Sequence, residues 1–145
     1  MSVREVQIVD YLDLVQPLLK ANWDETGFDF EFAPEFDKYI KAQEVGYVIA
    51  LGAFEGEELI GYSTAFMYPH HFNPAIIMCA TDALYVAPEH RNGTVGARLI
   101  IETEKLAKER GANMISWHTR AGTPLAEVMT KRGYTPADTI VMRSL

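Results

Sequence analysis

The sequence contains a single cysteine, which limits how the chain can be held together. Cys79 has no partner for an internal disulfide, and it lies inside the apolar run AIIMCATDALYV. A cysteine in such surroundings is typically a buried and unreactive thiol. We therefore expect no internal disulfide, and Cys79 gives no support for a covalent catalytic mechanism.

Long apolar runs and clusters of basic residues are also missing. No stretch approaches the roughly 20 apolar residues that cross a bilayer, and the start MSVREVQIVD has no signal-peptide apolar region. The Lys and Arg residues number 13 against 20 Asp and Glu, they are scattered, and the net charge is −7. We expect a cytoplasmic protein that binds neither membrane nor nucleic acid.

Linkers, internal repeats and low-complexity segments are absent, so the 145 residues are expected to form one domain, 1–145. Hydrophobic periodicity predicts the element order β-α-α-β-β-β-α-β-α-β. Asp10 is the expected N-cap of the first helix, and Pro17 would kink or shorten this helix unless it starts late. The three consecutive strands are expected to be antiparallel, and TIVMRSL at the C-terminus is expected to form the last strand.

Residues 84–111 carry the most specific pattern in the chain. A buried strand is followed by a loop with Gly93 and Gly96 and by an amphipathic helix from about Val95 to Arg110. A helix N-terminus has unpaired N–H groups and a partial positive charge, which together favour a bound phosphate. Two readings stay open: the glycines let an anionic ligand approach the backbone, or they only turn the chain and pack the helix.

The loop matches neither G-x-G-x-x-G nor G-x-x-x-x-G-K-[ST], but RNGTVG resembles motif A of the GCN5-related N-acetyltransferases, [QR]-x-x-G-x-[GA]. Arg91 and Gly96 match that pattern, whereas Thr94 replaces its first glycine and Gly93 stands one position early. The order of elements and the closing RGY also resemble the family, so the resemblance spans the chain. The compact chain and the variant loop are similar to acetyltransferase-like proteins of bacteriophages.

The resemblance implies an α/β (α+β) fold with a mixed, mostly antiparallel central sheet of six to seven strands and about four helices. The sheet is expected to splay between Leu84–Val86 and Ile115–Trp117. Acetyl-CoA is the implied co-substrate, and its implied binding residues are Leu84, Tyr85, Val86, Arg91, Asn92, Gly93, Thr94, Val95, Gly96 and Ala97.

Acetyl transfer to an amine needs a neutral nitrogen, donors for the developing oxyanion and a proton source for the thiolate. The resemblance assigns the donor role to backbone N–H groups of Leu84 or Val86. Asp82, on the same strand, is the first choice for the base, although strand twist would also explain an exposed carboxylate there. Alternation from Asp82 turns Tyr85 away from the cleft. Met129 stands where the family usually has a tyrosine that acts as the general acid. A thioether cannot donate a proton.

Residues that bind the acceptor are sought around Trp23, Glu25 and Phe28, in the segment that caps the acceptor site of the family, and at His118 on the strand lining the cleft. Acidic and aromatic side chains there would hold a cationic amine. The alternative is that they anchor the loop while the acids face water. The adjacent His70 and His71 have no third ligand at a recognisable spacing, so no metal is expected.

The sequence therefore predicts an N-acetyltransferase in which a small-molecule or protein amine attacks acetyl-CoA directly. The alternative is a non-catalytic interaction protein, phage-encoded or otherwise, that uses the same scaffold. Proteins of this family are frequently dimers, so a homodimer is a further expectation of the resemblance. The identity of the acceptor stays open.

Overall fold

The computed structural model describes residues 1–145 and is built around one five-stranded sheet. Its strands follow the order of the chain: β1 (Ser2–Glu5), β2 (Val48–Glu55), β3 (Glu58–His70), β4 (Asn73–Val86) and β5 (Met114–Ser116). The first four strands pair antiparallel, and β5 pairs parallel with β4. The mixed, mostly antiparallel sheet is confirmed, with five strands in place of the six or seven expected.

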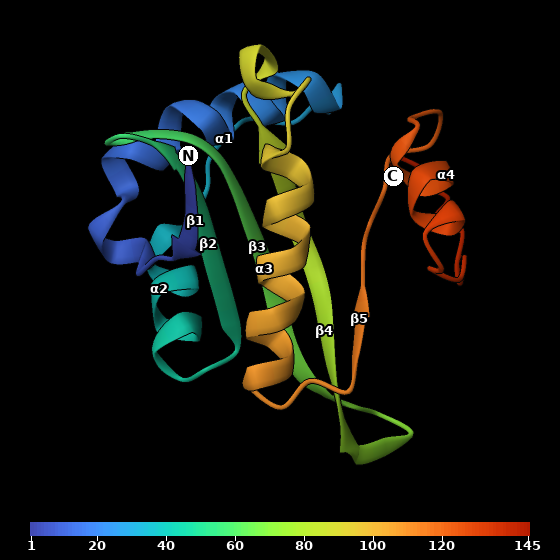
Figure 1. The fold of residues 1–145 in the computed structure, drawn as a ribbon. Helices are drawn as coiled ribbons and strands as arrows, with labels where there is room; N and C mark the ends of the chain where they lie inside the picture. Colours follow the sequence, from blue (N-terminus) through green and yellow to red (C-terminus); the bar gives the residue numbers. More distant parts are fainter.

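Helices cover both faces of this sheet (Figure 1). One layer consists of α1 (Leu12–Thr26) and α2 (Phe36–Glu44), the opposite layer is α3 (Val95–Glu109), and α4 (Leu125–Lys131) follows β5. Single 3-10 turns, Ile8–Asp10 and Pro88–His90, precede α1 and follow β4. None of the helices has the length and apolar character that a membrane span requires.

The first helix differs from its prediction at Asp10 and at Pro17. Its N-cap is Tyr11, because Asp10 already belongs to the 3-10 turn, and the helix continues through Pro17 for 15 residues. Pro17 lies inside the helix, where its missing N–H costs one backbone hydrogen bond, and the helix nevertheless continues to Thr26. Asp10 is therefore not the N-cap, and Pro17 does not shorten the helix.

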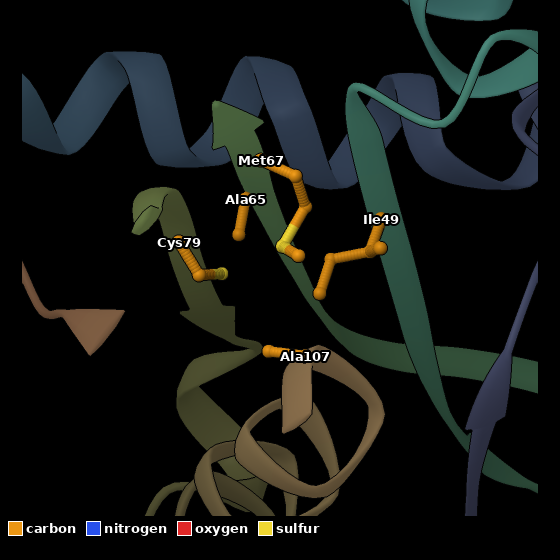
Figure 2. Packing of buried hydrophobic residues seen from close by; sticks show 5 residues of the cluster. All are labelled: Ile49, Ala65, Met67, Cys79 and Ala107. Atoms are coloured by element: carbon orange, nitrogen blue, oxygen red, sulfur yellow. The ribbon is translucent and has the colours of Figure 1, made fainter. Parts of the chain in front are cut away.

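The larger part of the core lies between the sheet and α3, and a smaller cluster of Ile8, Val48 and Ala50 packs against α1 and α2. One cluster joins Ile49, Ala65, Met67, Cys79 and Ala107 (Figure 2), and a second is formed by Leu51, Ala53, Ile60, Val95 and Leu99. The thiol of Cys79 is fully buried there, and this burial raises its pKa to about 11. The prediction of a buried, inert cysteine is confirmed, since a thiol protonated at neutral pH is a poor nucleophile.

The predicted last strand is wrong. No residue after α4 belongs to a strand, and Ile140, Val141 and Met142 are exposed. A strand needs a neighbouring edge to satisfy its backbone groups, and the chain leaves the sheet after only three residues of β5. Figure 1 shows α4 standing beside the body of the protein, with the C-terminus next to it.

Candidate functional site

A β-bulge in the middle of β4 determines where Asp82 points. Thr64 of β3 pairs with Ala83 and Ala65 pairs with Thr81, so Asp82 is an extra residue without a partner. The bulge brings Asp82 and Ala83 to the same face, toward α1 and α2. Bulges of this kind commonly re-aim a side chain next to an active site.

The same bulge overturns the prediction for Tyr85. Strict alternation from Asp82 would place Tyr85 on the opposite face, but the extra residue resets the alternation. Tyr85 is buried against Tyr62, with 5.9 Å between the ring centroids, and Tyr62 lines the same cavity as Asp82. Asp82 and Tyr85 therefore lie on one face of β4.

Two hydroxyl groups hold the carboxylate of Asp82. Tyr39 of α2 donates to Oδ2 over 3.0 Å, and Thr64 donates to the same atom over 3.2 Å. Burial, with the adjacent Asp82 carboxylate, raises the pKa of Tyr39, so its phenol stays protonated and keeps donating. No hydrogen bond within the chain occupies Oδ1, which leaves this oxygen available to a bound group.

Beyond the bulge, one edge of β4 is unpaired. The pairing of β4 with β5 ends at Ala80 and Ser116, which agrees with the splay that the resemblance implies. Ala87 donates its N–H to Ile60 of β3. Backbone groups of successive residues in a strand point to opposite edges, so Leu84 and Val86 direct theirs toward the opening.

The N-terminus of α3 lies beside this opening and offers a row of free donors. No hydrogen bond within the chain engages the backbone N–H groups from Asn92 to Ala97. Val95 is buried in the core, which fixes this first turn. Such a terminus fits the pyrophosphate of a coenzyme, because the N–H groups and the helix dipole both favour an anion.

Neither glycine of this loop is required by the packing of the protein. Both have a negative φ, so neither needs the left-handed region. A Cβ added to Gly93 would find its nearest neighbour, His90 O, at 4.0 Å, and one added to Gly96 would lie 3.8 Å from Val86 Cγ2. The alternative that the glycines serve a tight turn or close helix packing is therefore not supported, and the space above them stays open to a ligand.

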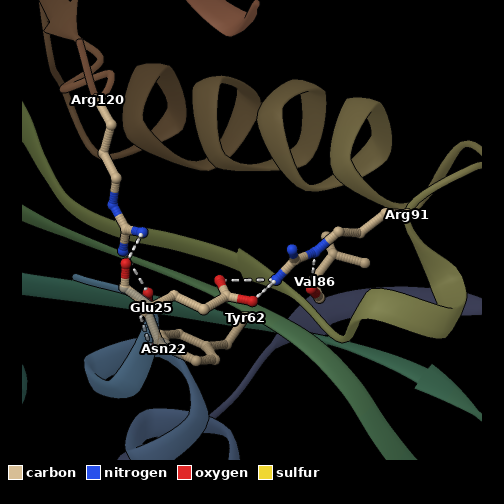
Figure 3. Close-up of polar contacts among 6 residues, drawn as sticks. All are labelled: Asn22, Glu25, Tyr62, Val86, Arg91 and Arg120. Carbon is tan, nitrogen blue, oxygen red and sulfur yellow. Dashed lines mark hydrogen bonds and ion pairs between the residues drawn. The ribbon is translucent and has the colours of Figure 1, made fainter. Parts of the chain in front are cut away.

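Arg91 and Glu25, predicted at the coenzyme and acceptor sites, form an ion pair (Figure 3). Arg91 Nη2 donates to both carboxylate oxygens over 2.7 and 2.9 Å, and its Nε donates to Val86 O. On the other side, Arg120 donates to Glu25 O and to Asn22 Oδ1, while Asn22 donates to the Tyr62 hydroxyl. The end of α1 is thus fixed to β3, to the end of β4 and to the segment after β5.

The other residues predicted to bind the acceptor are dispersed. His118 lies against β4, where its N–H donates to Thr81 Oγ1 and its Nδ1 is 2.6 Å from Thr81 O, one residue before Asp82. Phe28 instead stacks on Phe30, with 4.8 Å between the centroids. Trp23 packs against Phe32, and its indole N–H is buried without a hydrogen-bond partner. Only Glu25 and His118 of this set lie beside the opening.

Several residues of the site escaped the sequence analysis. Tyr39, Thr64, Asn22 and Arg120 belong to no recognisable motif, and their roles depend on register and on contacts across the chain. Tyr134, the tyrosine of the closing RGY, is half-buried, and its hydroxyl donates to Glu104 of α3. Burial and this carboxylate raise its pKa to about 12. Met129 is buried, so the position of the family's usual acid holds a packed thioether.

Known structures share this architecture. The fold is similar to an aminoglycoside acetyltransferase from an uncultured soil metagenomic sample, with a TM-score of 0.77 and 21% identity over 99% of this chain and 97% of the other. It also resembles the ribosomal-protein-alanine N-acetyltransferase of Brucella melitensis biovar Abortus, with a TM-score of 0.73 and 18% identity over 99% and 100% of the two chains.

A third similar structure is the aminoglycoside N-acetyltransferase AAC(6')-Iy in complex with CoA, with a TM-score of 0.73 and 14% identity over 99% of this chain and 98% of the other. At these identities the likeness establishes the fold. No curated protein sequence matches the chain. The sequence model of the Acetyltransferase (GNAT) family, however, matches residues 12–134, most of the chain. This match and the shared fold show that the chain belongs to the GNAT acetyltransferase family.

Proposed function

We propose that this protein is an N-acetyltransferase that moves the acetyl group of acetyl-CoA to a primary amine by direct attack. The observation that carries the proposal is the meeting of three features at one opening. These are the free N–H groups that begin α3, the unpaired edge of β4 and the carboxylate of Asp82. The CoA complex of a protein with the same fold supports the choice of coenzyme.

The coenzyme-binding role falls to the segment from Leu84 to Ala97. The N–H groups from Asn92 to Ala97 would hold the pyrophosphate, with Gly93 and Gly96 leaving room for it. Arg91 lies at the same end of β4, and its charge is balanced by Glu25 in the free protein. A phosphate group that approached Arg91 would compete with Glu25 for the guanidinium.

Acetyl-CoA, when bound, supplies an activated acetyl thioester to the opening between β4 and β5. The backbone N–H group of Leu84 or of Val86 would donate to the carbonyl oxygen as negative charge develops on it. Asp82 would accept the proton of the ammonium at its free oxygen, while Tyr39 and Thr64 fix the carboxylate in place. The amine would then attack as a neutral nucleophile.

The tyrosine that usually protonates the departing thiolate in this family has no counterpart on α4. Met129 has no proton to give, and the Tyr134 hydroxyl is committed to Glu104. We propose that the thiolate takes the proton released by the amine, directly or through water. A covalent intermediate on Cys79 has no part in this scheme, because the thiol is buried on the α3 face.

Thermal unfolding with acetyl-CoA, free CoA and ATP tests the coenzyme assignment. A ligand at about 100 times its Kd adds about 2.7 kcal/mol to the free energy of unfolding, which is a measurable rise in Tm. We expect both coenzymes to raise Tm and ATP to have less effect. No rise at millimolar acetyl-CoA would contradict the enzyme assignment and favour a non-catalytic interaction protein.

A single glycine substitution sharpens this test. The contact that a Cβ would make at Gly96 is ordinary, so Gly96→Ala should fold as well as the parent. The added methyl group would nevertheless occupy space that the pyrophosphate needs, and acetyl-CoA affinity should fall about tenfold or more, which corresponds to about 1.4 kcal/mol. Lys108→Ala, at the other end of α3, is the matched control and should leave the affinity unchanged.

A further inference from the structure

A cavity of about 140 Å³ lies between the sheet and the layer of α1 and α2, and we call it the α1–α2 cavity. It extends from Val6 and Ile8, near the N-terminus, to Asp82 and Ala83 at the bulge of β4. Of its 16 lining residues 12 are hydrophobic. For comparison, an apolar cavity of about 150 Å³ in another protein stays dry and binds benzene.

The charge in this cavity is confined to one end. Asp82 is the only lining residue with a formal charge. The hydroxyl groups of Tyr39 and Thr64 both donate hydrogen bonds to its Oδ2. Tyr62, the next polar group, accepts a hydrogen bond from Asn22. The free oxygen of Asp82 therefore offers one site for a cation at the mouth of a mostly apolar space.

The single charge and the apolar lining of the cavity together favour some amines over others. A single ammonium group can pair with Asp82 while an apolar substituent enters the cavity and leaves water, which is favourable in proportion to the buried area. A second charge or several hydroxyl groups on that substituent would lose their water and find only the hydroxyls of Tyr11 and Tyr62 as partners, which is costly. The cavity therefore favours a monoamine with a compact apolar body over a polyamine or an amino sugar.

We propose that the acceptor of this protein is a primary amine that carries one apolar group of about the size of a benzene ring, with its nitrogen at Asp82 and its apolar group in the α1–α2 cavity. The acceptor role rests on the proposed function, whereas the binding preference does not. The nitrogen would then lie at the bulge, beside the unpaired edge of β4 where an acetyl group is expected.

Binding of three probes to the free protein, measured by titration calorimetry without coenzyme, tests the preference. The probes are 2-phenylethylamine, methylamine, which keeps only the ammonium group, and 2-phenylethanol, which keeps only the apolar group. We expect 2-phenylethylamine to bind at least tenfold more tightly than either of the others. Equal affinity for methylamine would overturn the role of the cavity, and equal affinity for 2-phenylethanol would overturn the role of Asp82.

Two neighbouring positions on α1 give a matched pair of variants. Val15 lines the cavity, and Val15→Phe should fill it and weaken 2-phenylethylamine binding at least tenfold. Leu14 is 43% exposed and does not line the cavity, so Leu14→Phe should change the affinity less than twofold. Should Val15→Phe unfold, Leu19→Gln tests the same wall of the cavity with a polar group. Unchanged binding in a folded cavity variant would refute the proposal.

The two proposals fail in different ways. Tm shifts with acetyl-CoA report on the coenzyme site, and calorimetry with the amine alone reports on the cavity. If amine binding follows the expected order while acetyl-CoA has no effect, the cavity site stands and the transferase function fails. If acetyl-CoA binds and methylamine is acetylated as efficiently as 2-phenylethylamine, the function stands and the inferred acceptor class is wrong.

Discussion

The two faces of the central sheet are packed in different ways. Helix α3 buries Val95, Leu99, Thr103 and Ala107 against one face. Helices α1 and α2, on the other face, contain no fully buried residue and leave the α1–α2 cavity between themselves and the strands. The residues proposed for acceptor binding and proton transfer, Asp82 above all, lie on this looser face.

This difference indicates that the two faces of the sheet have different roles. Close packing on the α3 face gives stability and also fixes the first turn of α3, where the coenzyme is proposed to bind. The α1–α2 face is packed less closely, and this leaves space for a ligand. Changes on the α3 face should therefore lower stability, whereas changes on the α1–α2 face should alter binding and activity more than stability.

The largest expected effect is the loss of packing on the α3 face. Leu99 is fully buried, and Leu99→Ala should lower the free energy of unfolding by about 3–5 kcal/mol, through lost burial and the cavity left behind. Leu19→Ala, on the half-buried side of α1, should cost only about 1–2 kcal/mol because fewer contacts are lost. Urea unfolding of both variants measures the difference, and equal costs would remove the contrast between the faces.

The next effect concerns activity on the α1–α2 face. Asp82→Asn keeps an acceptor for Tyr39 and Thr64 but removes the proposed base, so the rate of CoA release with a saturating amine should fall about 100-fold or more. The free energy of unfolding should change by less than about 1 kcal/mol, because Asp82 is exposed. The Tm shift with acetyl-CoA should persist. Asp13→Asn, exposed on α1, is the control, and a full rate in Asp82→Asn would exclude Asp82 as the base.

The contrast between the faces also separates what the sequence reveals from what it hides. The loop and helix from Val86 to Glu109 could be predicted, because glycines, an amphipathic period and the closing Gly111 at φ +95° are local signals. The antiparallel strands β2, β3 and β4 followed from alternation and short turns. Each of these signals is contained within a few consecutive residues.

Features that depend on distant parts of the chain were not predictable. The bulge at Asp82 arises from the register between β3 and β4, and without it alternation assigns Tyr85 to the wrong face. Tyr39 reaches Asp82 across 43 positions of the sequence. The segment TIVMRSL has the composition of a strand, but composition cannot supply the neighbouring edge that a strand needs. Sequence reasoning therefore predicted the strand, loop and helix of residues 84–111 better than the surroundings of Asp82.

A smaller effect is expected from the buried hydroxyl pair on the α3 face. Thr103 Oγ1 donates to Ser63 Oγ over 3.0 Å, and both residues are fully buried. Thr103→Val should cost about 1–3 kcal/mol because it leaves the Ser63 hydroxyl without this partner. Thr64→Val, on the opposite face, should cost less because water can reach Thr64. Adding Ser63→Ala to Thr103→Val should recover part of the loss, and strictly additive costs would show that the two hydroxyls do not interact.

The smallest expected effect is a dependence of stability on alkaline pH. Burial raises the pKa of Cys79 from 9.0 to about 11, so between these values the thiol ionises in the unfolded chain and stays protonated in the folded protein. The unfolded state then binds fewer protons, and stability that is complete below pH 9 is lost as pH rises toward 11, by about 1 kcal/mol per pH unit. Tyr62, whose pKa burial raises to about 12, adds a loss of the same sign at higher pH. Urea unfolding at pH 8, 9, 10 and 11 should therefore give a shallower decline for Cys79→Ala than for the parent, whatever the variant costs at pH 8. Parallel declines would mean that Cys79 is not shielded on the α3 face as its packing indicates.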